Sequence, residues 1–123
     1  MKVSRSMLFA LVLCAASASA SAAESAPARR CGWLDNPTPG NWWLHDRDGE
    51  WTLGEQGGYQ AQGLDDLPDM STQGVIPANA PHGYSCACIT ATVDVQSRRV
   101  LRIVSGAPVP LAQCKADKAI RRP

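Results

Sequence analysis

The sequence predicts a small, mainly β domain with one short C-terminal helix and disulfide cross-links. Three observations predict it. Short apolar runs alternate with turn residues, one long segment near residue 90 alternates apolar and polar side chains, and four of the five cysteines follow position 30. A domain of this size buries only a small hydrophobic core, so covalent cross-links make physical sense. We therefore expect a small antiparallel sheet or barrel-like arrangement held by disulfides.

The first 23 residues have the pattern of a cleavable signal peptide. Lys2 and Arg5 precede an apolar stretch at 7–16 that is too short to span a bilayer, and small residues at 17–23 fit a cleavage site. Cleavage for lipid attachment at Cys14 is the less favoured alternative, because Leu13 precedes it. We predict a periplasmic or secreted protein with a flexible leader at 24–30, a single domain at 31–123, and no transmembrane segment after cleavage.

Net charge argues against a nucleic-acid partner. Cleavage removes Lys2 and Arg5 and no acid, which leaves 10 basic and 11 acidic residues, whereas nucleic-acid-binding domains are strongly basic. The charges are separated along the chain, however, with acids concentrated at 35–69 and bases at 98–122. Such asymmetry either steers a charged partner or is neutralised when the two regions pack together, and we favour the second interpretation.

Residues 41–54 are predicted to form a β-hairpin. Two strand-like runs, 42–45 and 51–53, flank Asp48-Gly49, which is a strong hairpin-turn signal. A two-residue loop at Asp48-Gly49 and a four-residue loop at 46–49 both remain open, and they give the same facing. Side chains alternate between the two faces of a strand, so one set shares the buried face: Trp42, Leu44, Trp51 and Leu53. Trp43 and His45 then point to the opposite face.

The rest of the domain is predicted with less detail. Residues 57–61 form a weakly supported third strand, and 64–83 read as a long loop. The clearest strand pair is 84–96 with 99–104, and 110–120 favours one short helix. In the first strand of the pair the apolar face consists of Ala87, Ile89, Ala91, Val93 and Val95.

Cys31, Cys86, Cys88 and Cys114 are predicted to form two disulfides. Cys86 and Cys88 lie two apart on one strand, so their Cβ atoms are roughly 6 to 7 Å apart, whereas a disulfide needs about 3.5 to 4.5 Å. Cys31 therefore bonds to one of this pair and Cys114 to the other, with both pairings open. The alternatives are a soft-metal site or a redox pair at Cys-x-Cys, which an oxidising compartment disfavours.

Trp43, His45 and Asp46 form the candidate binding surface. An exposed aromatic ring beside polar groups is typical of sugar or peptide recognition. His45 and His82 are the only histidines, and no serine occupies a Gly-x-Ser-x-Gly elbow. We predict no catalytic residue, no metal site and no cofactor.

Several motifs occur together along the chain: Cys31-Gly32-Trp33, Asn36-Pro37-Thr38-Pro39-Gly40-Asn41, Asp46-Arg47-Asp48-Gly49-Glu50-Trp51, Gly57-Gly58-Tyr59-Gln60 and Cys86-Ala87-Cys88. As a set they resemble a family of small secreted bacterial proteins classed only as a domain of unknown function. The resemblance covers nearly all of the chain after the signal peptide. It implies bacterial export and the four-cysteine layout, and it implies no activity.

These observations favour a non-enzymatic binding or inhibitory module of the bacterial envelope. Its partner would be an envelope glycan or protein. One alternative is an envelope enzyme that acts on a glycan or peptide polymer through Asp46, Glu50 or His45. The other is a metal or redox protein that uses Cys86 and Cys88.

Overall fold

The computed structural model describes residues 14–17, 25–79 and 81–123. The predicted signal peptide therefore lies outside the described residues except for 14–17. Six strands, a short 3₁₀ helix and one α-helix follow in the order β1 (Ala28–Asn36), β2 (Trp42–Asp46), β3 (Gly49–Gly54), η1 (Leu64–Asp66), β4 (Ile76–Asn79), β5 (His82–Asp94), β6 (Arg99–Val109) and α1 (Leu111–Ala116).

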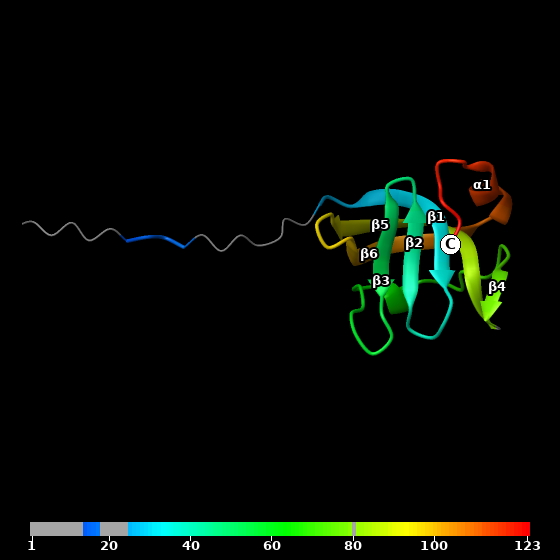
Figure 1. Cartoon of the computed structure of the whole chain (residues 1–123), viewed down its shortest axis with the longest axis horizontal. Helices are drawn as coiled ribbons and strands as arrows, with labels where there is room; N and C mark the ends of the chain where they lie inside the picture. Colours follow the sequence, from blue (N-terminus) through cyan, green and yellow to red (C-terminus); the bar gives the residue numbers. More distant parts are fainter. Residues whose placement is uncertain (1–13, 18–24, 80) are drawn as a thin grey trace, which may run out of the picture.

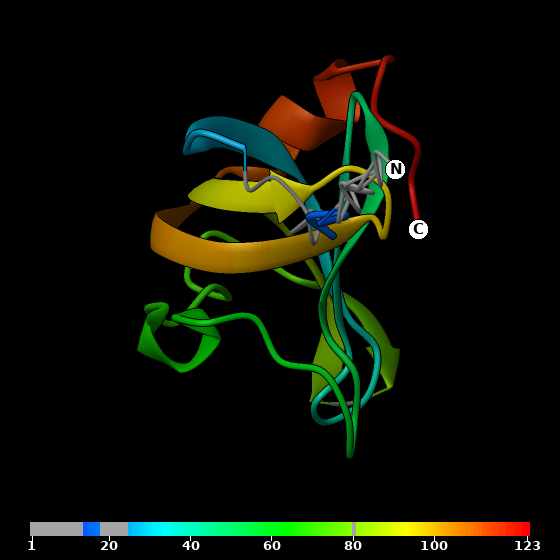
Figure 2. The same cartoon turned by 90° about the vertical axis from the view of Figure 1, so that its left-hand side faces the viewer.

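The sheet closes on itself to form a barrel (Figures 1 and 2). The strand order is β1-β2-β3-β6-β5-β4, and β1 also pairs with β5, so five strands make a complete ring. The short strand β4 pairs with the beginning of β5. All pairings are antiparallel except β3 with β6, which are parallel at Thr52 and Arg99. The predicted fold class is confirmed: a mainly β structure with one short C-terminal helix and two disulfides.

The β2–β3 hairpin has the predicted facing, and its register is that of the predicted four-residue loop at 46–49, because His45 pairs with Glu50. Asp46 also pairs with Gly49, so the remaining loop is Arg47-Asp48. A loop at Asp48-Gly49 would differ by two positions in the pairing and give the same faces. The inner face carries the side chains buried in the barrel core, namely Leu44, Trp51 and Leu53, with the partly buried Trp42 packed against them.

Strands β5 and β6 supply most of the remaining barrel core. The inner face of β5 is almost fully buried along Ala87, Ile89, Ala91 and Val93. Val95, predicted to continue this face, is instead exposed because β5 ends at Asp94. β6 extends five residues beyond the predicted end, since the long β5 pairs with it as far as Val109.

The segment between β3 and β5 differs from the prediction. Residues 57–61 form a turn with one isolated bridge rather than a third strand. The predicted loop at 64–83 contains η1, β4 and the start of β5. Leu64 and Met70 anchor it, because both are buried against the barrel core.

The stretch 24–30, predicted to be a flexible leader, belongs to the barrel from Ser25 onward. The Ser25 hydroxyl donates to the carbonyl oxygen of Val93 and accepts from the Val93 N–H, both at 3.0 Å. β1 begins at Ala28, which pairs with Ala91. The physical reason is that β5 is thirteen residues long. Without β1, the backbone N–H and C=O groups along one edge of β5 would have no hydrogen-bond partners.

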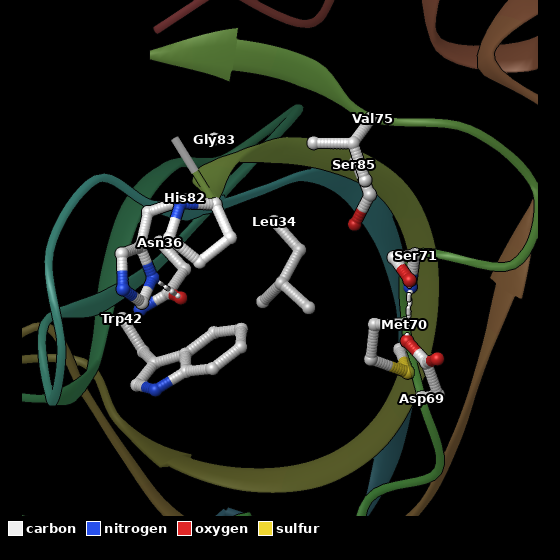
Figure 3. A pocket seen from close by; sticks show the side chains of 11 residues that line it. Leu34, Asn36, Trp42, Asp69, Met70, Ser71, Val75, His82, Gly83 and Ser85 are labelled. Carbon is white, nitrogen blue, oxygen red and sulfur yellow. Dashed lines mark hydrogen bonds between the residues drawn. The ribbon is translucent and has the colours of Figure 1, made fainter. Parts of the chain in front are cut away.

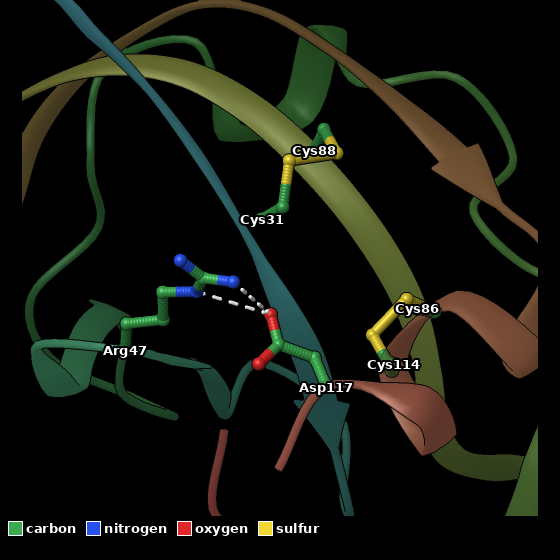
Figure 4. Close-up of a disulfide and its surroundings, with 6 residues drawn as sticks. All are labelled: Cys31, Arg47, Cys86, Cys88, Cys114 and Asp117. Carbon is green, nitrogen blue, oxygen red and sulfur yellow. Dashed lines mark hydrogen bonds and ion pairs between the residues drawn. A yellow bond between two sulfur atoms is a disulfide. The ribbon is translucent and has the colours of Figure 1, made fainter. Parts of the chain in front are cut away.

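Two disulfides join both ends of the domain to β5 (Figure 4). Cys31 of β1 bonds Cys88, its direct partner in the β1–β5 register. Cys86 bonds Cys114 of α1 and thereby holds the helix on the outer face of the barrel. Around this second bond lies a small outer hydrophobic cluster, which we call the α1 cluster; its buried members are Trp33, Cys86 and Cys114.

Candidate binding surfaces

The barrel has two ends that are filled differently. The tip end lies at the β2–β3 turn, residues 46–49, and the base end lies at the β1–β2 connection, residues 37–41. At the tip end, the Asp46 carboxylate is buried and accepts hydrogen bonds from the Trp51 indole and from Arg30, each at 3.0 Å. The Asp46 side chain therefore fills the tip end of the barrel and lies on the inner face of β2, opposite Trp43 and His45.

Two arginines cover the ring of Trp51. The Arg98 guanidinium lies 3.7 Å from the ring centroid and that of Arg30 lies 4.4 Å from it. Arg98 also donates to the backbone carbonyl oxygens of Asp48 and Glu50. Arg98 of the basic region therefore contacts the hairpin through the Trp51 ring and two backbone oxygens, and, among the described residues, the ion pair that joins the two regions is Arg47 with Asp117.

The outer face of β2 and β3 presents Trp43, His45, Glu50 and Thr52. Trp43 lies between Asp35 of β1 and Thr52 of β3 in the register. Within the described part of the chain, Trp43 belongs to neither hydrophobic cluster, whereas the other three tryptophans belong to or pack against one. We call Trp43, Asp35 and Thr52 the Trp43 row. It places an aromatic ring between a carboxylate and a hydroxyl.

His45 lies one row further toward the tip end, between two carboxylates. Its Nε2 is 3.7 Å from Asp35 Oδ2, and its Nδ1 is 3.7 Å from Glu50 Oε2. Only 14% of the His45 side chain is exposed, and its Nε2 is buried without a hydrogen-bond partner. Burial raises the pKa of Asp35, while the neighbouring His45 opposes that shift. Trp43 and His45 therefore share one surface, as predicted from alternation.

A cleft of about 480 Å³ lies between the hairpin turn and the C-terminal tail. His45 and Glu50 line one side, and Arg121 and Arg122 line the other. The Arg47–Asp117 ion pair, at 3.0 Å, joins the turn to the tail beside α1 (Figure 4). Nothing in the sequence pattern indicated this contact, because 70 residues separate its two partners.

The base end contains a second hollow, shown in Figure 3. His82, the second of the two histidines, lines it. The His82 Nδ1 lies 2.9 Å from Asn36 Oδ1. The Asn36 amide nitrogen donates to the carbonyl oxygens of Thr38 and Asn41, so Asn36 Oδ1 is the acceptor and His82 Nδ1 carries the proton.

The geometry of the barrel bears on the enzyme, redox and metal alternatives that the sequence raised. Asp46 faces into the barrel and Glu50 lies on the opposite face of the hairpin, so these two carboxylates do not flank one glycosidic bond. Cys86 and Cys88 are both oxidised in disulfides. In the described ranges, no group of three or more His, Cys, Asp or Glu side chains is arranged to hold a metal ion. None of the helices described is long and apolar enough to cross a membrane.

These features define a small, disulfide-linked β-barrel in which Asp46 is buried at the tip end and Trp43 is partly exposed on the outer face. The chain belongs to the family described as "Protein of unknown function (DUF4087)", which matches residues 25–121. The family resemblance predicted from the sequence is thereby confirmed. No curated protein and no solved structure matches the chain.

Proposed function

We propose that this chain is an exported, non-enzymatic binding module of the bacterial envelope that holds a glycan on the outer face of β2 and β3. The observation that carries the proposal is the position of Trp43. It is partly exposed on an outer strand face and contributes to neither hydrophobic cluster of the described residues. A large aromatic ring outside the core has no folding role that explains it, and such rings are typical binding anchors.

The neighbours of Trp43 suit a sugar ligand. A sugar ring stacks its apolar face on an aromatic side chain while its hydroxyl groups bond to polar side chains beside the ring. Asp35 and Thr52 lie on either side of Trp43 in the register, and Glu50 lies in the next row. The carboxylates Asp35 and Glu50 repel polyanions, which favours a neutral or cationic glycan over a nucleic acid.

The strand connectivity supports the same face by analogy. A closed five-stranded barrel in which the third strand runs parallel to the last has the topology of OB-fold barrels, and these bind oligonucleotides or oligosaccharides on the face of strands 2 and 3. Fold alone does not assign function, so the analogy supports the choice of face rather than the ligand. The two disulfides suit an oxidising compartment outside the cytoplasm.

The test compares the full chain, exported through its own N-terminus and purified, with its Trp43→Ala variant. Binding is measured by calorimetry with N-acetylglucosamine oligomers and with solubilised peptidoglycan fragments. We expect at least one probe to bind the parent and Trp43→Ala to weaken that binding about tenfold or more. The circular dichroism spectrum should stay that of the parent, because Trp43 lies outside the core clusters.

Val104→Ala is the control, because it truncates an apolar side chain that likewise lies outside the core clusters and is 55% exposed on β6. Its binding should equal that of the parent. Equal binding by Trp43→Ala and the parent, or no binding of either probe by the parent, contradicts the proposal. Chromatography of the probes after incubation checks the enzyme alternative, since cleaved fragments would show turnover.

A further inference from the structure

The base-end cavity is a separate hollow on the inner side of the barrel wall. It encloses about 250 Å³. Its apolar walls come from Leu34 of β1, Trp42 of β2, and Met70 and Val75 of the β3–β5 connection. Because Trp42 and Trp43 are adjacent on one strand, they face opposite sides of the sheet. A ligand in this cavity therefore does not touch the Trp43 row.

The Ser85 hydroxyl is directed into this cavity. Ser85 is only 6% exposed, and no described residue makes a hydrogen bond with its hydroxyl. Figure 3 shows the Ser85 oxygen pointing into the hollow, on the side opposite His82 and Asn36. Among the described residues, the buried side-chain nitrogen and oxygen atoms without a hydrogen-bond partner are Arg30 Nε and His45 Nε2. The Ser85 oxygen is therefore open to the hollow, and a ligand group that enters it can bond to this hydroxyl.

The remaining polar groups at the cavity set the charge of that ligand. Among the residues that the structure describes, no lysine or arginine lines the cavity. Asp69 lies at its edge, and hydrogen bonds from the Ser71 hydroxyl and N–H hold the pKa of Asp69 below its ordinary value, so the carboxylate is charged. On the opposite side, the Asn36 side-chain oxygen accepts a hydrogen bond from His82 Nδ1. An anionic ligand meets repulsion here, whereas a neutral or cationic one does not.

From this geometry we infer a second, small-molecule site at the base end of the barrel. It takes a neutral or cationic molecule with an aromatic or alicyclic body and a hydrogen-bonding group that reaches Ser85. The size fits such a molecule, because an apolar protein cavity of about 150 Å³ is enough to hold benzene. The apolar body packs against Leu34, Trp42 and Met70. Ser85 and His82 lie on opposite sides of the cavity. The imidazole is therefore not placed to activate the Ser85 hydroxyl as a nucleophile, and we infer a binding site rather than a hydrolytic one.

Three probes of matched size and different charge test the inference on the intact protein: p-cresol (neutral), tyramine (cationic) and p-hydroxybenzoate (anionic). Titrations followed by ¹H–¹⁵N NMR and by calorimetry should show binding of p-cresol or tyramine at least tenfold tighter than of p-hydroxybenzoate. The amide of Ser85 and the indole of Trp42 should shift, and the indole of Trp43 should not. Shifts at Trp43 in place of Trp42 would overturn the assignment, as would failure of both p-cresol and tyramine to bind.

Two variants and a control locate the bound probe. Ser85→Ala keeps the cavity and removes the hydroxyl, so it should weaken p-cresol binding about fivefold or more. Val75→Trp enlarges a side chain that is 36% exposed at the rim, so it should block binding with little effect on the barrel core. Ser105→Ala, an exposed serine on β6, should bind as the parent does. Parent-like binding by both Ser85→Ala and Val75→Trp would refute the site, whether or not the Trp43 surface binds glycans.

Discussion

Trp51 and Asp46 are joined at the tip end of the barrel by a 3.0 Å hydrogen bond from the indole Nε1 to the carboxylate Oδ1. The other oxygen of Asp46 lies 3.0 Å from the Arg30 guanidinium, which in turn covers the Trp51 ring. One carboxylate therefore satisfies two buried donors that lie on different strands. The sequence placed Asp46 among the binding residues, whereas its contacts in the barrel are those of a structural group.

Asp46→Ala should lower the free energy of unfolding by about 2 to 4 kcal/mol, because it leaves the Trp51 N–H and the Arg30 charge without their buried partner. Asp48→Ala is the matched control. Asp48 lies at the same 3.0 Å from Arg30, but its side chain is 69% exposed, so the loss should stay below about 1 kcal/mol. Urea unfolding followed by tryptophan fluorescence measures both, and equal losses would contradict the structural role.

The disulfides should each contribute several kcal/mol. The closed loops span separations of 57 and 28 residues, for which the chain-entropy model gives about 4 kcal/mol each. Cys86→Ser with Cys114→Ser should also release α1 from the outer face, whereas Cys31→Ser with Cys88→Ser should leave α1 in place. Hydrogen exchange at residues 111–116 distinguishes the two double variants. Mass spectrometry of the unreduced protein should find the pairs Cys31–Cys88 and Cys86–Cys114, and any other pairing would disprove the arrangement.

Gly32 lies where β1 passes closest to β2. A Cβ atom at this position would overlap the backbone carbonyl oxygen of His45, so Gly32→Ala must displace a strand. We expect a loss of about 3 kcal/mol or more, or failure to fold. Gly58→Ala is the control, because its Cβ would have no neighbour closer than 3.7 Å, and its stability should be unchanged or slightly raised. Thermal unfolding of the two variants decides the matter, and a stable Gly32→Ala protein would exclude so close a strand approach.

Asp35 should make stability decrease with rising pH. Its pKa is raised in the folded protein by burial, so the folded state holds the proton more tightly than the unfolded chain does. The contribution is complete below the ordinary pKa of 3.8 and is lost as the pH rises through the higher folded value. Asp35→Asn should therefore gain stability relative to the parent as the pH rises through this window.

Asp69→Asn provides a control of opposite sign. The pKa of Asp69 is lowered by Ser71, so its contribution is present above 3.8 and disappears as the pH falls through the lower folded value. Denaturant unfolding of the parent and both variants between pH 3 and 7 measures the two trends. The same slope for both variants would show that burial does not control Asp35.

The outer and inner faces of the hairpin could be predicted from the sequence because they depend only on alternation along a strand. Trp43 and His45 share the outer face, and Leu44, Trp51 and Leu53 share the inner face, as the pattern requires. The two predicted loops, at 48–49 and at 46–49, give the same faces because their pairings differ by two positions, and the structure has the register of the second. Bonding of Cys31 and Cys114 to the two cysteines of β5 was also predictable, because side chains two apart on a strand are too far from each other.

The sequence by itself determined local features of this protein: the β2–β3 hairpin and the β5–β6 pair, the faces of these strands, and the impossibility of a Cys86–Cys88 bond. Only the tertiary structure decided which strands close the barrel, which cysteine pairs with which, and where Arg30, Arg98 and Ser85 lie. The physical reason is distance along the chain. Alternation and turn chemistry act over a few residues, whereas the β1–β5 register joins residues more than 45 positions apart and depends on the packing of the whole core.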